Sequence, residues 1–384
     1  MSSRNTKKKK KFELNMDYSL LVIMAFLICF GLVMLYSCSS YDGLIEHNDS
    51  MYYLKQQLVK TMMGIGAMLF VAIFVDYHFY AKLATAGYLF SFFLLMLVRF
   101  TPLGIGAKGA KRWLDLKVFS FQPSEAMKIA IIIFIPYMIC RMGKNVQTLK
   151  GSLSVLGAGA AAFLGVYKLT DNLSTGIIVM GIAVGILFVV HKNTKLLIKI
   201  GLGGLGVTYA LAYLVGSIFS NSDKFRIRRL IAWVNPEKYA NGFSFQTIQG
   251  LYAIGSGGFF GKGLGNGAQK MIIPEVQNDM ILSAICEELG IFGALVVLVL
   301  FGMLLYRLLF IAKNAPDIYG SLMVTGIFTH IALQVILNIG VVTNMIPNTG
   351  ITLPFISFGG TSLIFLLLEM GIALSVSSKI RVRD

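Results

Sequence analysis

Long apolar stretches constrain this chain more than any other feature of its sequence. Ten of them, each about 18 to 25 residues long, alternate with short polar connections: 18–38, 57–75, 82–98, 122–140, 151–168, 172–190, 195–220, 280–306, 318–342 and 355–377. A helix of about 20 apolar residues crosses the ~30 Å hydrocarbon core of a bilayer. Only 14% of the residues are charged, against roughly 25% in soluble domains. The sequence therefore predicts an all-α polytopic membrane protein with ten transmembrane helices.

The placement of basic residues predicts the orientation of these helices. If the N-terminal tail with Lys7–Lys11 is cytoplasmic, every second connection should be basic too. Four such connections are, with Arg141, Lys192, Arg307 and Lys379 as members, whereas 76–81 is neutral or acidic. We therefore expect a multi-pass plasma-membrane protein with both termini cytoplasmic: tails 1–17 and 378–384 around a membrane domain 18–377. The basic tail suits anionic membrane lipids; without a folded basic module it does not indicate nucleic-acid binding.

This orientation leaves two external loops, 99–121 and the large 221–278 between helices seven and eight. Together they hold twelve of the 34 Lys and Arg residues, on the side where such residues should be scarce. They are either the solvated charge of a large loop or an anion site on the outer face. Residues 223–240 predict an amphipathic helix at the interface. The seven glycines of 255–267 allow positive φ and anion-binding nests of backbone N–H groups.

Ionisable groups inside the spans are costly and are functional candidates by default. Glu125 and Lys128 lie three residues apart, so they share a helix face and can pair, either as a structural lock or as part of a site. His330, Gln334 and Asn338 recur every four residues, which favours interhelical hydrogen bonding over catalysis. Glu369 is interpreted as structural. No cluster has metal-ligand spacing, so no metal residue is assigned.

The stretch PEVQNDMILSAICEEL, 274–289, places four carboxylates at the start of an apolar run. Asp279 should lie at the external water boundary, with Glu287 ~12 Å deeper along a helix. Helical geometry prevents Asp279, Glu287 and Glu288 from forming one cluster. Glu287 and Glu288 should therefore be buried and need partners. Asp279, below a cationic loop, is either a general base or an N-terminal charge favoured by the helix dipole.

Five motifs occur in an order that resembles the SEDS family (shape, elongation, division and sporulation proteins) across about 18–377. They are GAKRW at 109–113, QPSE at 122–125 with Lys128, GSGGFFGKGLG at 255–265, PE at 274–275 with Asp279, and PFISFGGTS at 354–362. PNTGITLP at 347–354 and NLST at 172–175 are similar to the FtsW/SpoVE branch. The chain departs from the family at Phe245, Phe358, Met280 and Asn172, which puts individual hydrogen bonds in doubt.

The resemblance implies a peptidoglycan glycosyltransferase that polymerises lipid II, the undecaprenyl-diphosphate-linked disaccharide peptide, at the outer face of the membrane. It implies a class B penicillin-binding protein and other divisome proteins as partners, and the division septum as location. Asp279 takes the position of the family's essential aspartate. The substrate-binding set is Lys111, Arg112, Glu125, Lys128, Arg226, Arg229, Gln246, Lys270 and Ser357.

The implied reaction makes two chemical demands on the residues of the site. Cations must stabilise the leaving diphosphate, and the acceptor hydroxyl needs a base, which fits Asp279. No cofactor is assigned, and a divalent cation such as Mg²⁺ or Mn²⁺ is left open. A lipid II flippase or other transporter would instead place charges along a path across the membrane. A non-catalytic divisome scaffold would tolerate the loss of Asp279.

Overall fold

The computed structural model describes residues 16–107, 110–115, 117, 120–218 and 225–380. Within these residues nine helices are long and apolar enough to cross a membrane, which confirms the polytopic all-α class. They are α1 (Tyr18–His47), α2 (Tyr52–Phe74), α3 (His78–Phe100), α4 (Pro123–Met142), α5 (Leu149–Thr170), α6 (Leu173–Val190), α7 (Thr194–Ile218), α10 (Ile281–Asn314) and α11 (Ile318–Val342). The basic tail with Lys7–Lys11 lies outside the described residues.

The tenth expected span is shorter than the sequence suggested. Helix α12 runs over Ser362–Ser377, 16 residues, whereas the apolar block begins at 355. Phe355 and Gly360 have φ values of +63° and +51°, which no right-handed helix can contain. Residues 343–361 therefore form a non-helical segment between α11 and α12, which we call the 343–361 segment.

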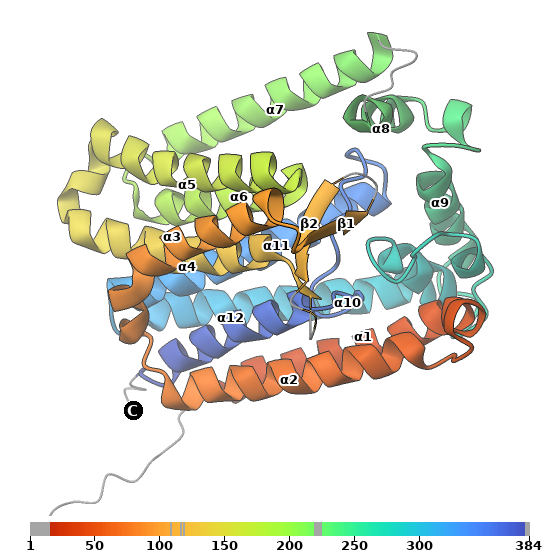
Figure 1. Cartoon of the computed structure of the whole chain (residues 1–384), viewed down its shortest axis with the longest axis horizontal. Helices are drawn as coiled ribbons and strands as arrows, with labels where there is room; N and C mark the ends of the chain where they lie inside the picture. Colours follow the sequence, from red (N-terminus) through yellow and green to blue (C-terminus); the bar gives the residue numbers. More distant parts are fainter. Residues whose placement is uncertain (1–15, 108–109, 116, 118–119, 219–224, 381–384) are drawn as a thin grey trace, which may run out of the picture.

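The helices form one bundle around α11 (Figure 1), which packs against α4, α6, α10 and α12. The backbone N–H of Asp17 donates to Ser377 Oγ at 3.3 Å, and Asp17 pairs with Arg307 at 2.5 Å. The start of α1 and the ends of α10 and α12 therefore share one end of the bundle. This arrangement is consistent with both chain termini lying on one side of the membrane. The assignment of that side to the cytoplasm stays a prediction.

The opposite end of the bundle carries the elements of the two expected external loops. A small antiparallel sheet of β1 (Gly104–Ala107), β2 (Ala110–Asp115) and β3 (Ser120–Phe121) lies between α3 and α4. Helices α8 (Phe225–Val234) and α9 (Phe245–Gly257) precede α10, and α8 covers the first half of the expected amphipathic stretch. Helix α7 lies at the edge of the bundle and packs mainly on α8 (Figure 1). Short 3₁₀ turns occupy Gly143–Gln147, Glu237–Tyr239 and Gln269–Met271.

Helix α10 is interrupted at Gly290, and the glycine-rich loop fills the break. Gly290 has φ +69°, and a Cβ there would lie 2.3 Å from the carbonyl oxygen of Phe259, so only glycine fits. The backbone N–H groups of Lys262 and Gly263 donate to the carbonyls of Glu287 and Glu288 at 3.0 and 2.9 Å. The backbone polar groups freed by the break are thus satisfied by the loop, as a buried position requires.

Candidate active site

Asp279 lies just before α10 at the loop-bearing end of the bundle, and it is 9% exposed. Its carboxylate Oδ1 accepts a hydrogen bond from Gln246 Nε2 of α9 at 3.1 Å. Its backbone carbonyl accepts from Asn338 Nδ2 of α11 at 2.9 Å. Side chains from two other helices thus fix both the carboxylate and the backbone of this residue.

An arginine of α8 is linked to this carboxylate through Asn348 of the 343–361 segment and through Gln246. Asn348 Nδ2 donates to Gln246 Oε1 at 3.2 Å, and Arg229 Nη1 of α8 donates to the carbonyl of Asn348 at 3.1 Å. Arg112 of β2 donates to the carbonyl of Asp171 at 3.5 Å. The sequence-predicted residues Arg229, Gln246 and Asp279 are therefore brought together around Asn348.

The electrostatics suit Asp279 to proton transfer. Burial raises the pKa of its carboxyl above the ordinary aspartate value, and the nearby Arg229 offsets only part of that rise. Burial also lowers the pKa of Arg229, and the charge of Arg112 lowers it further. Burial therefore influences the pKa of Asp279 more than the nearby cations do. A carboxylate with a raised pKa is the stronger base.

A second polar cluster lies at the start of α12. Lys128 Nζ contacts Glu125 Oε2 at 2.8 Å, with both side chains at most 7% exposed, which confirms the expected pairing on one helix face. Ser362 Oγ donates to Glu125 Oε2 at 3.1 Å. On its other side Lys128 Nζ lies 3.0 Å from His330 Nε2, and His330 Nδ1 lies 2.7 Å from Glu369 Oε2.

Within the polar stripe of α11, His330 contacts Lys128 of α4 and Glu369 of α12, the interhelical bonding that the spacing predicts, whereas Gln334 and Asn338 bind a non-helical segment. Gln334 Nε2 donates to the carbonyl of Thr352 at 3.0 Å, and Asn338 Nδ2 donates to the carbonyl of Ile351 at 2.8 Å. Both bonds hold the 343–361 segment, which the sequence did not identify as a separate element. The stripe thus supports the segment that runs past Asp279.

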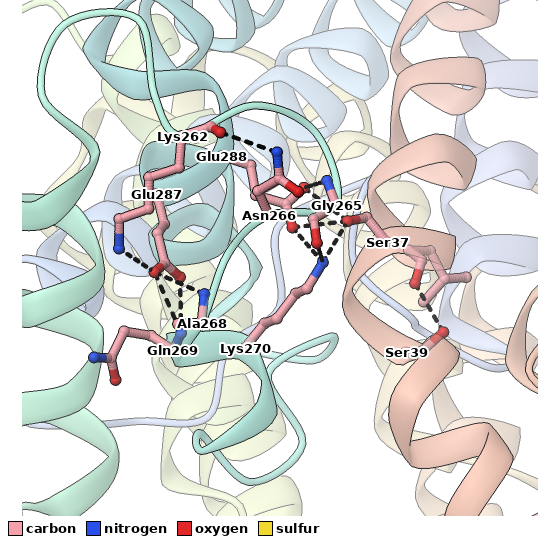
Figure 2. A network of polar contacts seen from close by, with 11 residues as sticks. Ser37, Ser39, Lys262, Gly265, Asn266, Ala268, Gln269, Lys270, Glu287 and Glu288 are labelled. Carbon is pink, nitrogen blue, oxygen red and sulfur yellow. Dashed lines mark hydrogen bonds and ion pairs between the residues drawn. The ribbon is translucent and has the colours of Figure 1, made fainter.

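The last two acids of the 274–289 stretch, Glu287 and Glu288, anchor the glycine-rich loop (Figure 2). Glu287 accepts from Lys262 Nζ at 2.7 Å and from the backbone N–H groups of Ala268 and Gln269. Glu288 accepts from Lys270 Nζ at 2.6 Å, from Ser37 Oγ of α1 and from the N–H of Gly265. Both glutamates are fully buried, so the expectation of buried, partnered acids is confirmed.

The motifs have counterparts in a family of known proteins. A family model described as cell cycle protein, covering FtsW, RodA and SpoVE, matches residues 18–382. The chain belongs to the FtsW/RodA/SpoVE family. It is 39% identical to stage V sporulation protein E of Bacillus subtilis (strain 168), over 94% of this chain and 96% of that protein. It is 36% identical to a probable peptidoglycan glycosyltransferase FtsW of Geobacter sp. (strain M18), over 95% and 97%.

The fold of this SEDS chain is also that of a solved relative. A chain of a structure described as structural coordination of polymerization and crosslinking by a peptidoglycan synthase complex superposes with a TM-score of 0.74. That chain is 25% identical, and the match covers 94% of this chain and 97% of that one. The resemblance inferred from the five motifs is thus confirmed at the level of family and fold.

Four other residues assigned to the substrate have different surroundings or escape description. Lys270 is 6% exposed and paired with Glu288, so its charge already has a buried partner and it is not kept in the substrate-binding set. The Ser357 hydroxyl is buried and accepts from the N–H of Leu353 at 2.8 Å, which makes it a brace of its own turn. Lys111 is exposed on β2. Arg226 falls in α8, but its side chain lies outside the described part of the chain.

Two polar residues in or beside the 343–361 segment were missed in the sequence. Asn348, within the quoted PNTG motif, links Gln246 to Arg229. Lys60 of α2 is half-buried, with Nζ 5.0 Å from the ring centre of Phe358 and 3.3 Å from Gln56 Oε1. The sequence signal for this residue was a single cation within the apolar block 57–75. Among the described residues no group of three or more His, Cys, Asp or Glu side chains could hold a metal ion.

Proposed function

We propose that this chain polymerises lipid II into glycan strands at the outer face of the plasma membrane, with Asp279 as the catalytic base. The observation that carries the proposal is the buried Asp279 carboxylate, held by Gln246 within reach of the charge of Arg229. The FtsW relatives are named as probable peptidoglycan glycosyltransferases, which supports the same reaction class.

In the proposed step, an acceptor sugar hydroxyl attacks the anomeric carbon of the donor. Asp279 takes the hydroxyl proton as the new glycosidic bond forms and the bond from the anomeric carbon to the diphosphate oxygen breaks. The diphosphate leaves with the electron pair of that bond. Its developing charge needs fixed cations, a role assigned to Arg229, Arg112, Lys111 and Arg226.

Glu125 and Lys128 act differently in this proposal. Both side chains are buried, so we assign them a supporting role. Their contact with the site is the hydrogen bond from Ser362, the first residue of α12, to Glu125. Removal of either partner would leave the other charge buried and unmatched, which is strongly destabilising. We therefore expect both single alanine variants to impair polymerisation.

The proposal includes a partner and a place. The described residues include no sizeable external domain that could crosslink peptides, so we propose a complex with a class B penicillin-binding protein at the division septum. The solved relative comes from a complex described by both polymerization and crosslinking, which supports such a pairing. Robust processive synthesis that no such partner affects would count against it.

The test is strand synthesis from lipid II by purified protein, alone and with its partner. Asp279→Asn should fold and bind the partner but lose at least ~10²-fold in rate, the usual contribution of a positioned base. Glu275→Gln is the matched control, because Glu275 is a neighbouring acid that is exposed. Activity of Asp279→Asn within a few-fold of wild type would remove Asp279 as the base and favour the transporter or scaffold alternatives.

A further inference from the structure

Four ionisable side chains form a continuous buried line between α4, α11 and α12. The line runs from Glu125 through Lys128 and His330 to Glu369, with contacts of 2.8, 3.0 and 2.7 Å. Exposed fractions of the four residues are 5% or less. Only the Glu125 end contacts Ser362, the first residue of α12, which directly follows the 343–361 segment that contains Asn348, and the first two members alone account for that contact. His330 and Glu369 therefore need a separate explanation.

The short distance between Lys128 and His330 restricts where protons can be. At 3.0 Å one of the two nitrogens must present a lone pair, because two protonated cations would repel strongly in a low-dielectric interior. An alkyl ammonium holds its proton far more tightly than an imidazolium does. The proton therefore stays on Lys128, and His330 Nε2 is the acceptor.

Glu369 determines which histidine nitrogen is free. A neutral imidazole has one N–H and one lone pair, and a carboxylate 2.7 Å from Nδ1 requires the N–H at Nδ1. The Nε2 lone pair is thereby presented to Lys128. Two of the three ammonium donors are then fixed, one on Glu125 and one on His330, so the direction of the ammonium group is fixed as well.

We propose that His330 and Glu369 are positioning residues of the active site, acting through Lys128 and Glu125 on Ser362 and the first turn of α12. This inference rests on the proposed function, since the contact that it positions belongs to the proposed site. With a neutral His330 the line carries two carboxylates and one ammonium. The positive N-terminal end of the α12 dipole, where Ser362 meets Glu125, offsets part of the excess negative charge.

Among the helices that pack around the line, α2 brings one half-buried cation, Lys60, whose Nζ lies 5.0 Å from the ring centre of Phe358 just ahead of α12. Helix α6, which also packs on α11, has no ionisable side chain. On α10, Glu287 and Glu288 pair with loop lysines and Arg307 pairs with Asp17. Tyr252, the ionisable side chain of α9, is exposed. Among the described residues, His330 makes its side-chain polar contacts with Lys128 and Glu369.

The direct test is ¹⁵N NMR of the full-length protein labelled at its four histidines. The signal that disappears in His330→Gln identifies His330. We expect a neutral ring with the proton on Nδ1 and a free Nε2 in the wild type, and loss of that preference in Glu369→Leu. An imidazolium, or a proton on Nε2, in the wild type would overturn the inference. This readout does not depend on enzymatic activity.

The second test compares matched variants in strand synthesis. His330→Leu and Glu369→Leu should lose about 10- to 100-fold in turnover, the range for one charged hydrogen bond. His330→Gln, whose amide oxygen can accept from Lys128, should recover most of it. Thr329→Val, the adjacent position whose hydroxyl bonds its own helix, is the control. Wild-type turnover in His330→Leu would refute the positioning role.

Failure of the variants to fold and inactivity of the wild-type protein have different consequences for the inference. If the leucine variants do not fold, the glutamine variant and the NMR of the wild type still decide the matter. If wild-type protein makes no strands under any condition, the proposed function fails, whereas the protonation pattern of His330 is still tested by NMR.

Discussion

The buried pair between Lys270 and Glu288 offers a quantitative test of how the glycine-rich loop is held. Their side chains are 6% and 0% exposed, with Nζ and Oε1 2.6 Å apart. Glu288→Leu would leave the Lys270 ammonium buried without its counter-charge. Such a loss typically costs about 3–5 kcal/mol of unfolding free energy, and we expect a value in that range.

The double variant Glu288→Leu/Lys270→Met separates charge pairing from packing. Without either charge the main penalty is gone, although Ser37 and Gly265 also lose contacts. The double variant should therefore be more stable than Glu288→Leu alone, with an interaction energy of about 1–3 kcal/mol. Lys55→Met is the control: the Lys55–Asp49 pair is 64% and 36% exposed, so its loss should leave the stability nearly unchanged.

The measurement is denaturant unfolding in detergent micelles, with comparison restricted to variants of equal m-value. A double variant no more stable than the worse single variant would show that the two charges do not interact. A loss below about 1 kcal/mol in Glu288→Leu would show that water or lipid headgroups reach Lys270, against the burial described above.

Three other predictions follow from the structure. Cysteine labelling of intact cells should mark Lys238→Cys and spare Lys313→Cys; the reverse pattern would invert the topology. Because burial raises the pKa of the Asp279 carboxyl, the rate of strand synthesis should begin to fall at a higher pH on acidification than an exposed aspartate would give. The same raised pKa contributes folding stability at low pH, and this stability is lost as the pH rises through the raised pKa. Gly290→Ala should lower thermal stability, since its Cβ would meet the Phe259 carbonyl at 2.3 Å, whereas Gly302→Ala, which has open space, should not.

The sequence was informative where a single segment carries the signal. Nine spans follow from the length and apolar character of their blocks, and the Glu125–Lys128 pair follows from its spacing on one helix. The late start of α12 could not be predicted in the same way. It depends on the positive φ of Phe355 and on the hydrogen bond from the N–H of Phe358 to the carbonyl of Gln277, both set by tertiary packing.

Contacts between distant segments were beyond prediction for a physical reason. Lys262 and Lys270 are chemically equivalent in the sequence, and only the path of the loop makes one a half-exposed partner of Glu287 and the other a buried partner of Glu288. His330 and Glu369 are 39 positions apart on different helices. Their contact depends on how α11 and α12 are rotated against each other, which hydropathy does not encode.

The interruption of α10 at Gly290 has a consequence for how the protein opens. Glycine-rich chain has more conformational freedom when unfolded than any other composition, so the loop over 257–271 would be the natural place for local fraying. Yet its amides donate to carbonyls within α10, and amides of α10 donate to carbonyls within the loop. Loop and helix therefore form one cooperative unit, in which loop amides exchange with solvent deuterium only when the top of α10 itself unravels.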